Sequence, residues 1–190
     1  MIIASVDNGV FDDYLGGCGL DVLRLPAGSP AKTYNEVLRE NNGWICFVHA
    51  DVTCKGLVEA IVDTIDARPD HVVGAVGNGS RWSLRNKLFD VTTCDSCCIV
   101  VNTEWGIYFD EVTFDGFHLY VEDFCVQARE KGIKCTTMYL DGFEGYRRFD
   151  TDRWFVHHSK SLNKYGCAWG DYVEYKDKLN KKWGRVIPTT

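Results

Sequence analysis

An uninterrupted apolar run, Trp44–Val48, constrains the fold of this 190-residue chain more than any other segment. The run follows Gly43 and is too short for a helix, so it predicts a strand that is buried on both faces. His49, Ala50 and Asp51 come next, and in an open α/β sheet ligands bind beyond the carboxyl ends of the strands. A carboxylate there can hold a divalent cation, which in turn can hold a diphosphate. We therefore expect a metal–nucleotide complex at Asp51 with His49 beside it; a polar turn capped by Asp51 is the simpler alternative.

Strand and helix patterns alternate over the first half of the chain. Strands are predicted at 2–6, 21–25, 44–48 and 72–76. Helices are predicted from Pro30, which suits a first helical position, and from Leu57, where apolar residues recur at helical spacing. This alternation is typical of an α/β fold with a mostly parallel central sheet flanked by helices. No repeat, linker or shift in composition divides the chain, so we expect a single domain over residues 1–190.

Two pairs of polar residues in the second half could carry chemistry. Glu122 and Asp123 open a helix predicted over about 119–131, where carboxylates are stabilised by the helix dipole and one could also serve as a general base. His157 and His158 follow the short apolar run 154–156 at the end of a predicted strand. Neutral imidazole is a common metal ligand, although a buried histidine more often has a packing role. Because neighbouring strand residues face opposite ways, only one of the two histidines would face a site.

Charge and composition exclude some classes of protein. The net charge of −6 argues against a nucleic-acid clamp or a membrane-surface binder, although lysines crowd the C-terminal stretch. No run of 18 apolar residues is present, and the N-terminus enters a strand directly, so we expect no membrane span and a cytoplasmic location. Nine cysteines lie mostly in apolar patterns, which favours buried thiols over a zinc site with four ligands.

Four segments occur in a fixed order: Ser29-x-x-Lys32-x-Tyr34-Asn35, Phe47-Val48-His49-Ala50-Asp51-Val52, Gly116-Phe117-His118-x-Tyr120-x-Glu122-Asp123-x-x-x-Gln127-Ala128-x-x-x-Gly132 and His157-His158-Ser159. Together they resemble family-2-like glycosyltransferases of GT-A fold, in particular the small soluble branch that includes streptomycin-biosynthesis-type transferases. The resemblance covers about residues 2–183. It implies a GT-A-like domain, the nucleotide-diphosphosugar transferase fold. About 1–100 would bind the nucleotide sugar, and about 101–190 would bind the acceptor and carry catalysis.

The resemblance assigns a metal site and a catalytic pair. Asp51 matches the metal and diphosphate contact, and His49 replaces the first acidic residue of the usual Asp-x-Asp motif, which leaves strict metal dependence open. The late histidine that completes the metal shell in many relatives matches His157 or His158. The catalytic Glu-Asp pair matches Glu122 and Asp123, with Asp123 the preferred base.

The resemblance also places the donor. Asp7 and Asn8 would hold the nucleotide base, and Lys32 and Asn35 would lie near the nucleotide. The family implies a divalent cation, manganese or magnesium, and transfer with inversion to a hydroxyl of a soluble acceptor. A hexosyl or pentosyl donor is expected. The acceptor stays open among a small molecule, a glycan, a protein and a modified nucleic-acid base, the last disfavoured by the acidic charge.

Three other classes of function remain open. A sugar-nucleotide nucleotidyltransferase would carry a glycine-rich loop after the first strand, where this chain has only Asn8-Gly9-Val10 and a distant Gly16-Gly17. A non-catalytic nucleotide- or sugar-binding module is consistent with His49 in place of an acidic residue. A purely structural protein would show no stabilisation by any ligand.

Overall fold

The apolar run Trp44–Val48 forms strand β3 of a seven-stranded sheet, within a computed structural model that describes residues 1–6, 14–78, 81–144, 151–158 and 169–189. The strand order is β2-β1-β3-β9-β5-β10-β8. The other strands of this sheet are β1 (Ile2–Val6), β2 (Leu23–Leu25), β5 (His71–Gly74), β8 (Asp90–Val91), β9 (Cys98–Asn102) and β10 (Lys134–Thr137). The predicted strands at 2–6 and 44–48 are therefore confirmed to the residue.

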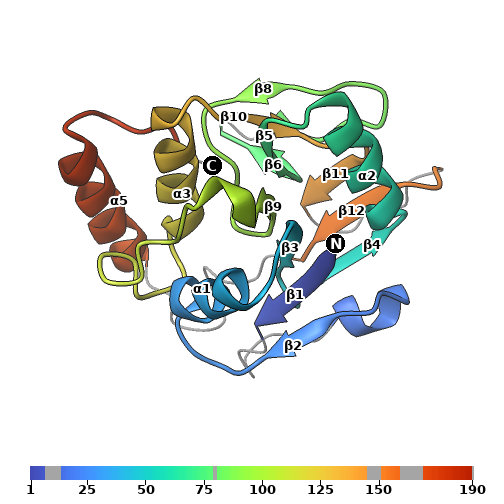
Figure 1. The fold of residues 1–190 in the computed structure, drawn as a ribbon, viewed down its shortest axis with the longest axis horizontal. Coiled ribbons are helices and arrows are strands. Elements are labelled where there is room, and N and C mark those ends of the chain that lie inside the picture. The colour runs from blue at the N-terminus through green and yellow to red at the C-terminus, as the bar shows by residue number, and fades with distance from the viewer. Residues whose placement is uncertain (7–13, 79–80, 145–150, 159–168, 190) are drawn as a thin grey trace.

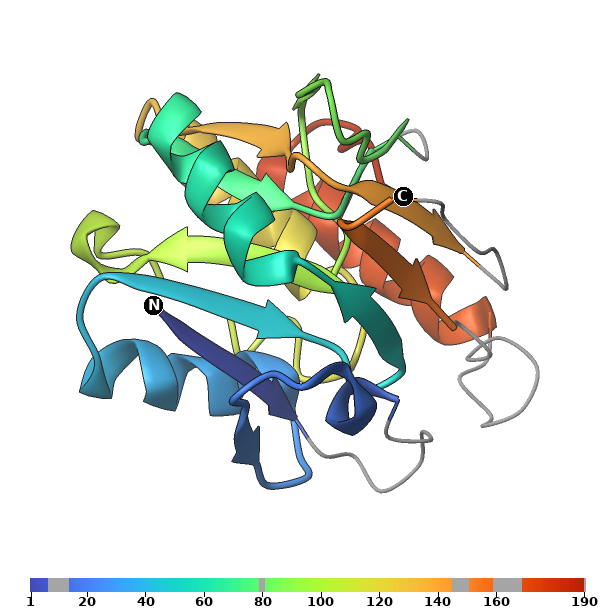
Figure 2. The same cartoon turned by 90° about the vertical axis from the view of Figure 1, so that its right-hand side faces the viewer.

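Directions within the sheet correct one expectation. Strands β1 and β2 and strands β1 and β3 pair in parallel, as do β5 and β10, but β9 runs antiparallel to both β3 and β5, and β8 runs antiparallel to β10. Figure 2 shows β9 pointing opposite to β1 and β3. The expected mostly parallel sheet is wrong: the sheet is mixed. A parallel neighbour needs a long crossover, usually helical, whereas between β5 and β9 the described chain forms only the short strands β6 (Val76–Gly77), β7 (Arg81–Trp82) and β8.

Helices cover both faces of the sheet. Figure 1 shows α1 (Pro30–Glu40), α3 (Tyr120–Glu130) and α5 (Trp169–Trp183) on one side and α2 (Leu57–Ala67) on the other. Strand β3 contributes to a hydrophobic core on each face of the sheet. Ile45 and Phe47 pack with α1 and α3 in one core, and Cys46 and Val48 pack with α2 in the other. This alternation follows from the two-residue period of a strand. It explains why the run is apolar at every position.

A three-stranded sheet lies beyond the carboxyl end of β3. It has the order β11-β12-β4, with β4 at Val52–Lys55, β11 at Asp141–Glu144 and β12 at Trp154–His157. Strand β12 pairs antiparallel with β4, so that His157 lies opposite Val52. Short 3-10 helices occur at Leu15–Cys18 (η1) and Thr103–Trp105 (η2). This small sheet brings the late part of the chain to the end of β3.

No helix of the described residues is both long enough and apolar enough to cross a bilayer.

The eight cysteines among the described residues are free thiols, and seven of these are buried. The cysteines therefore act mainly as small apolar residues of the two cores.

Candidate functional site

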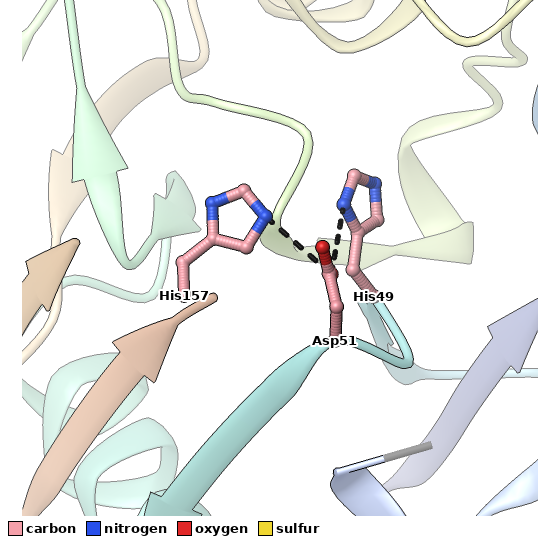
Figure 3. A group of neighbouring side chains, drawn as sticks. All are labelled: His49, Asp51 and His157. Atoms are coloured by element: carbon pink, nitrogen blue, oxygen red, sulfur yellow. Dashed lines mark ion pairs between the residues drawn. The ribbon is translucent and has the colours of Figure 1, made fainter. Parts of the chain in front are cut away.

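Three side chains converge beyond the end of β3. His49 and Asp51 lie on the turn between β3 and β4, and His157 is the last residue of β12 (Figure 3). Asp51 Oδ1 lies 3.4 Å from His157 Nε2 and 3.9 Å from His49 Nδ1. The pairing of β4 with β12 causes this convergence, because it sets His157 opposite Val52, next to Asp51 in the chain. We call these three residues the His-Asp-His triad.

The Asp51 carboxylate is buried but has an oxygen that no hydrogen bond satisfies. The residue is 4% exposed, and Oδ1 accepts no hydrogen bond of good geometry from any described residue. Burial alone would raise the pKa of Asp51, but His157 and His49 outweigh it and hold that pKa below its usual value. A buried ionised oxygen whose nearest histidine nitrogen is His157 Nε2 at 3.4 Å is poorly satisfied, so this oxygen suits a bound cation.

His49 is arranged as a neutral imidazole. Burial lowers the pKa of His49, and the attraction of Asp51 offsets only part of that effect. His49 Nε2 lies 3.3 Å from Tyr120 Oη. A proton on Nε2 would be donated to this hydroxyl and leave the lone pair of Nδ1 on the side of Asp51. One carboxylate oxygen and two imidazole nitrogens, all within 4.8 Å of one another, form a donor set that fits a divalent transition metal.

His158 belongs to a different set of contacts. Its Nε2 lies 2.6 Å from Thr53 Oγ1, and its ring lies 4.4 Å from the ring of Tyr14. Its backbone N–H donates to Asp51 O at 2.9 Å. Of the two candidate histidine ligands, the structure brings His157 to Asp51 and turns the His158 ring elsewhere.

The carboxylates of Glu122 and Asp123 both lie in the first turn of α3, as predicted, and both are buried. Asp123 is fully buried and accepts hydrogen bonds from Trp183 Nε1 at 2.8 Å and from Gln127 Nε2 at 2.8 Å. Lys182 Nζ lies 2.8 Å from its Oδ1 and 2.9 Å from its Oδ2. All of these contacts are intramolecular, and two of the partners come from the last turn of α5. Asp123 thus anchors α5 to α3.

Glu122 has different neighbours. Tyr120 and Tyr172 both have raised pKa values, chiefly through burial, and the negative charge of Glu122 adds to the effect on each. The Glu122 charge therefore acts on Tyr120, whose hydroxyl contacts His49, and on Tyr172 of α5. Leu119, which precedes the helix, adopts a left-handed backbone with φ of 62°, a conformation that costs a leucine energy. The chain is strained at the point that sets the start of α3.

The residues expected near the nucleotide divide into three cases. Asn35 is buried and holds the loop after η2, since its amide donates to Phe109 O and Glu111 Oε2 and its Oδ1 accepts from Phe109 N. Lys32 lies on the exposed side of α1. Asp7 and Asn8 lie outside the described residues.

Two residues near the triad were not anticipated from the sequence. Asp95, Cys97 and His157 form a second group whose ligand atoms lie within 4.8 Å of one another. Asp95 and Cys97 lie just before β9, and because β9 runs antiparallel to β3 its amino end lies at the carboxyl end of β3. In the sequence, Asp95 lies two residues before Cys97, which directly precedes β9, but only the direction of β9 shows that Asp95 lies at the site.

Comparisons with known proteins place the fold. No protein-family model and no curated protein matches the chain. Among solved structures, residues 1–349 of TarS from S. aureus, a wall teichoic acid glycosyltransferase, match with a TM-score of 0.50 and 17% sequence identity. The match covers 82% of this chain and 50% of the TarS chain, so this chain spans about half of that structure. The likeness supports a glycosyltransferase-like fold, consistent with a GT-A arrangement.

Proposed function

We propose that this chain transfers a sugar from a nucleotide-diphosphosugar to an acceptor hydroxyl. The observation that carries the proposal is the buried, ionised Asp51 carboxylate between two imidazoles at the carboxyl end of β3. In sheets of this kind that edge is where ligands bind. The likeness of the fold to a glycosyltransferase supports sugar transfer as the reaction class.

The His-Asp-His triad would hold a divalent cation. Such a cation, when bound, stabilises the negative charge that develops on the departing diphosphate. The chain contributes one charged oxygen and two neutral nitrogens, and Tyr120 orients one of the two imidazoles. His49 thereby fills the place of an acidic residue with a ligand that adds no charge, so the site carries one negative charge before the donor binds.

Glu122 is the base that we propose, with Asp123 in a positioning role. The Glu122 carboxylate would take the proton of the acceptor hydroxyl as the hydroxyl oxygen attacks the anomeric carbon. The bond from that carbon to the diphosphate oxygen breaks in the same step, so a single displacement inverts the anomeric centre. Asp123 is less suited to this role, because its two oxygens already accept from Lys182, Trp183 and Gln127.

Donor binding would involve the region between β1 and α1. We propose that Asp7 and Asn8 contact the nucleotide base and that Lys32 lies near the phosphates, while Asn35 supports this region through the loop at Phe109. The acceptor is a small molecule, a glycan, a protein or a modified nucleic-acid base.

A nucleotide screen tests the proposal. The purified chain is melted with UDP, GDP, CDP or dTDP and their sugar conjugates, each with manganese, magnesium or a chelator. A ligand that binds only the folded chain raises Tm by mass action. We expect one nucleotide to raise Tm, and we expect Asp51→Asn and the chelator to remove the shift. Asp66→Asn, an exposed aspartate on α2, is the matched control that keeps it.

Turnover separates the competing functions. Release of nucleoside diphosphate from a sugar conjugate supports transfer, and pyrophosphate release from a triphosphate would support a nucleotidyltransferase instead. Tight binding without turnover would indicate a non-catalytic module. If no nucleotide changes Tm, the donor site is wrong.

A further inference from the structure

The second donor group lies directly beside the His-Asp-His triad. Asp95, Cys97 and His157 offer a carboxylate oxygen, a thiol sulfur and a ring nitrogen within 4.8 Å of one another. Backbone contacts fix this arrangement, because Cys97 N–H donates to Asp95 Oδ1 at 2.8 Å and His49 N–H donates to Cys97 O at 3.0 Å. The two groups are thus held side by side at the carboxyl end of β3. We call the second one the thiol group.

The two groups favour different cations. Imidazole and carboxylate alone accept a wide range of divalent metals, including manganese. A thiolate is a soft ligand, and a set of sulfur, nitrogen and oxygen donors is typical of zinc and of its heavier analogue cadmium. Cys97 is fully buried, whereas Asp95 and His157 are partly exposed. A cation would therefore enter past Asp95 and His157 and meet the sulfur last.

One imidazole is common to both groups. A neutral imidazole has a single ring nitrogen with a free lone pair, so His157 can ligate only one cation at a time. Asp95 and Cys97 do not join Asp51 and His49 in one group in which every ligand atom lies within 4.8 Å of every other. One cation cannot collect all five side chains in this geometry. Occupation of one group withdraws His157 from the other.

We propose that Asp95, Cys97 and His157 form a binding site for a thiophilic divalent cation of the zinc class, whose occupation excludes a cation from the His-Asp-His triad. Binding forms the sulfur–metal bond and releases the thiol proton of Cys97 to solvent, with no change in oxidation state. That zinc would thereby inhibit the enzyme rests on the proposed function, but the binding and the competition do not.

Cadmium titration tests the site directly. Formation of a cadmium–thiolate bond gives a near-ultraviolet charge-transfer absorption, which needs neither donor nor acceptor. The background is Cys167→Ser, which removes the cysteine outside the described residues. We expect one equivalent of this absorption in that background and its loss in Cys97→Ser. Cys98→Ser is the matched control, because Cys98 is the adjacent, equally buried thiol and contacts Cys46 instead, so its band should remain.

Manganese binding, followed by loss of the free-ion electron paramagnetic resonance signal, tests the competition. Bound manganese should be released as cadmium fills the thiol group, and His157→Gln should lose both ions. Asp95→Asn leaves the sulfur in place, and it should weaken cadmium binding without changing manganese binding. This variant tests the proposal if Cys97→Ser fails to fold. An unchanged band in Cys97→Ser, or cadmium and manganese bound together, would overturn the proposal. Failure of glycosyl transfer with intact cadmium–manganese competition would overturn only the proposed function.

Discussion

Replacement of Asp123 by asparagine should weaken the fold, because this carboxylate links α3 to the end of α5. The residue is fully buried and accepts from Lys182 Nζ, Trp183 Nε1 and Gln127 Nε2 at 2.8–2.9 Å. The asparagine has the same shape but only one acceptor oxygen, and its amide would face at least one N–H donor. The charged Lys182 would then face a neutral amide that offers only one acceptor oxygen.

The size of the effect follows from these contacts. Hydrogen bonds to charged groups contribute about 1.5–3 kcal/mol each, and breaking a buried pair costs about 3–5 kcal/mol. Lys182 is 29% exposed, so water compensates part of its loss. We expect the free energy of unfolding to fall by about 2–4 kcal/mol. In a domain of this size that lowers Tm by roughly 4–16 °C.

Urea unfolding of four variants measures this effect. Asp123→Asn and Lys182→Met should each destabilise the chain, and the double variant should lose less than the sum of the two, because each removes the same contact. Asp66→Asn, on the exposed side of α2, should change the free energy of unfolding by less than about 0.5 kcal/mol. Glu122→Gln should lose transfer activity, which is measured with the donor found in the nucleotide screen.

One pattern would refute this reasoning. If Asp123→Asn unfolds within about 0.5 kcal/mol of the parent chain but loses transfer, Asp123 is the base and its contacts with α5 are incidental. Strict additivity of the two single variants would likewise show that Lys182 and Asp123 do not stabilise each other.

Three further predictions concern the metal site, acid stability and the loop after η2. Asp51→Asn should abolish the rise in Tm that manganese gives the nucleotide-free chain, and a chelator should reverse that rise in the parent. Burial opposes ionisation of Asp110, but Lys182 and Thr113 lower its pKa to about 2. Its stabilisation of up to ~2 kcal/mol is therefore complete above its unfolded pKa near 4 and lost as pH falls through about 2; urea unfolding at several pH values should show a flatter acid limb in Asp110→Asn. Asn35→Ala should cost roughly 2–4 kcal/mol in urea unfolding, because it leaves the buried N–H and C=O of Phe109 unpaired; a loss under about 1 kcal/mol would show that water replaces the amide.

Local patterns were enough to predict strands β1, β2, β3 and β5 and helices α1, α2 and α3, but not helix α5 or strand direction. The run Cys98–Asn102 is apolar enough to be read as a buried strand either way, and nothing in it shows that it runs against β3. Direction depends on how the preceding loop returns to the sheet, which is a property of the whole chain. The mixed sheet was missed for this reason.

The same limit applies to the site. Asp51 and His49 could be placed from the sequence, because they directly follow an identifiable strand. The choice of His157 over His158 depends on the register between β4 and β12, and Asp95 depends on the direction of β9. For Glu122 and Asp123 the pattern placed both in the first turn of α3, but which one packs against α5 is decided by partners some sixty positions later.

The link between Asp123 and the last turn of α5 has a consequence for synthesis on the ribosome. Strand β3, the turn at Asp51 and helix α3 leave the exit tunnel well before Lys182 and Trp183 exist. Until then the Asp123 carboxylate of the nascent chain lacks its partner Lys182, and the apolar surface that Leu179 later covers is exposed. Such intermediates are the ones that aggregate or engage chaperones. Yield of folded protein should therefore depend on how quickly α5 is synthesised, and rare codons just before Trp169 should lower that yield more than the same codons placed before β5.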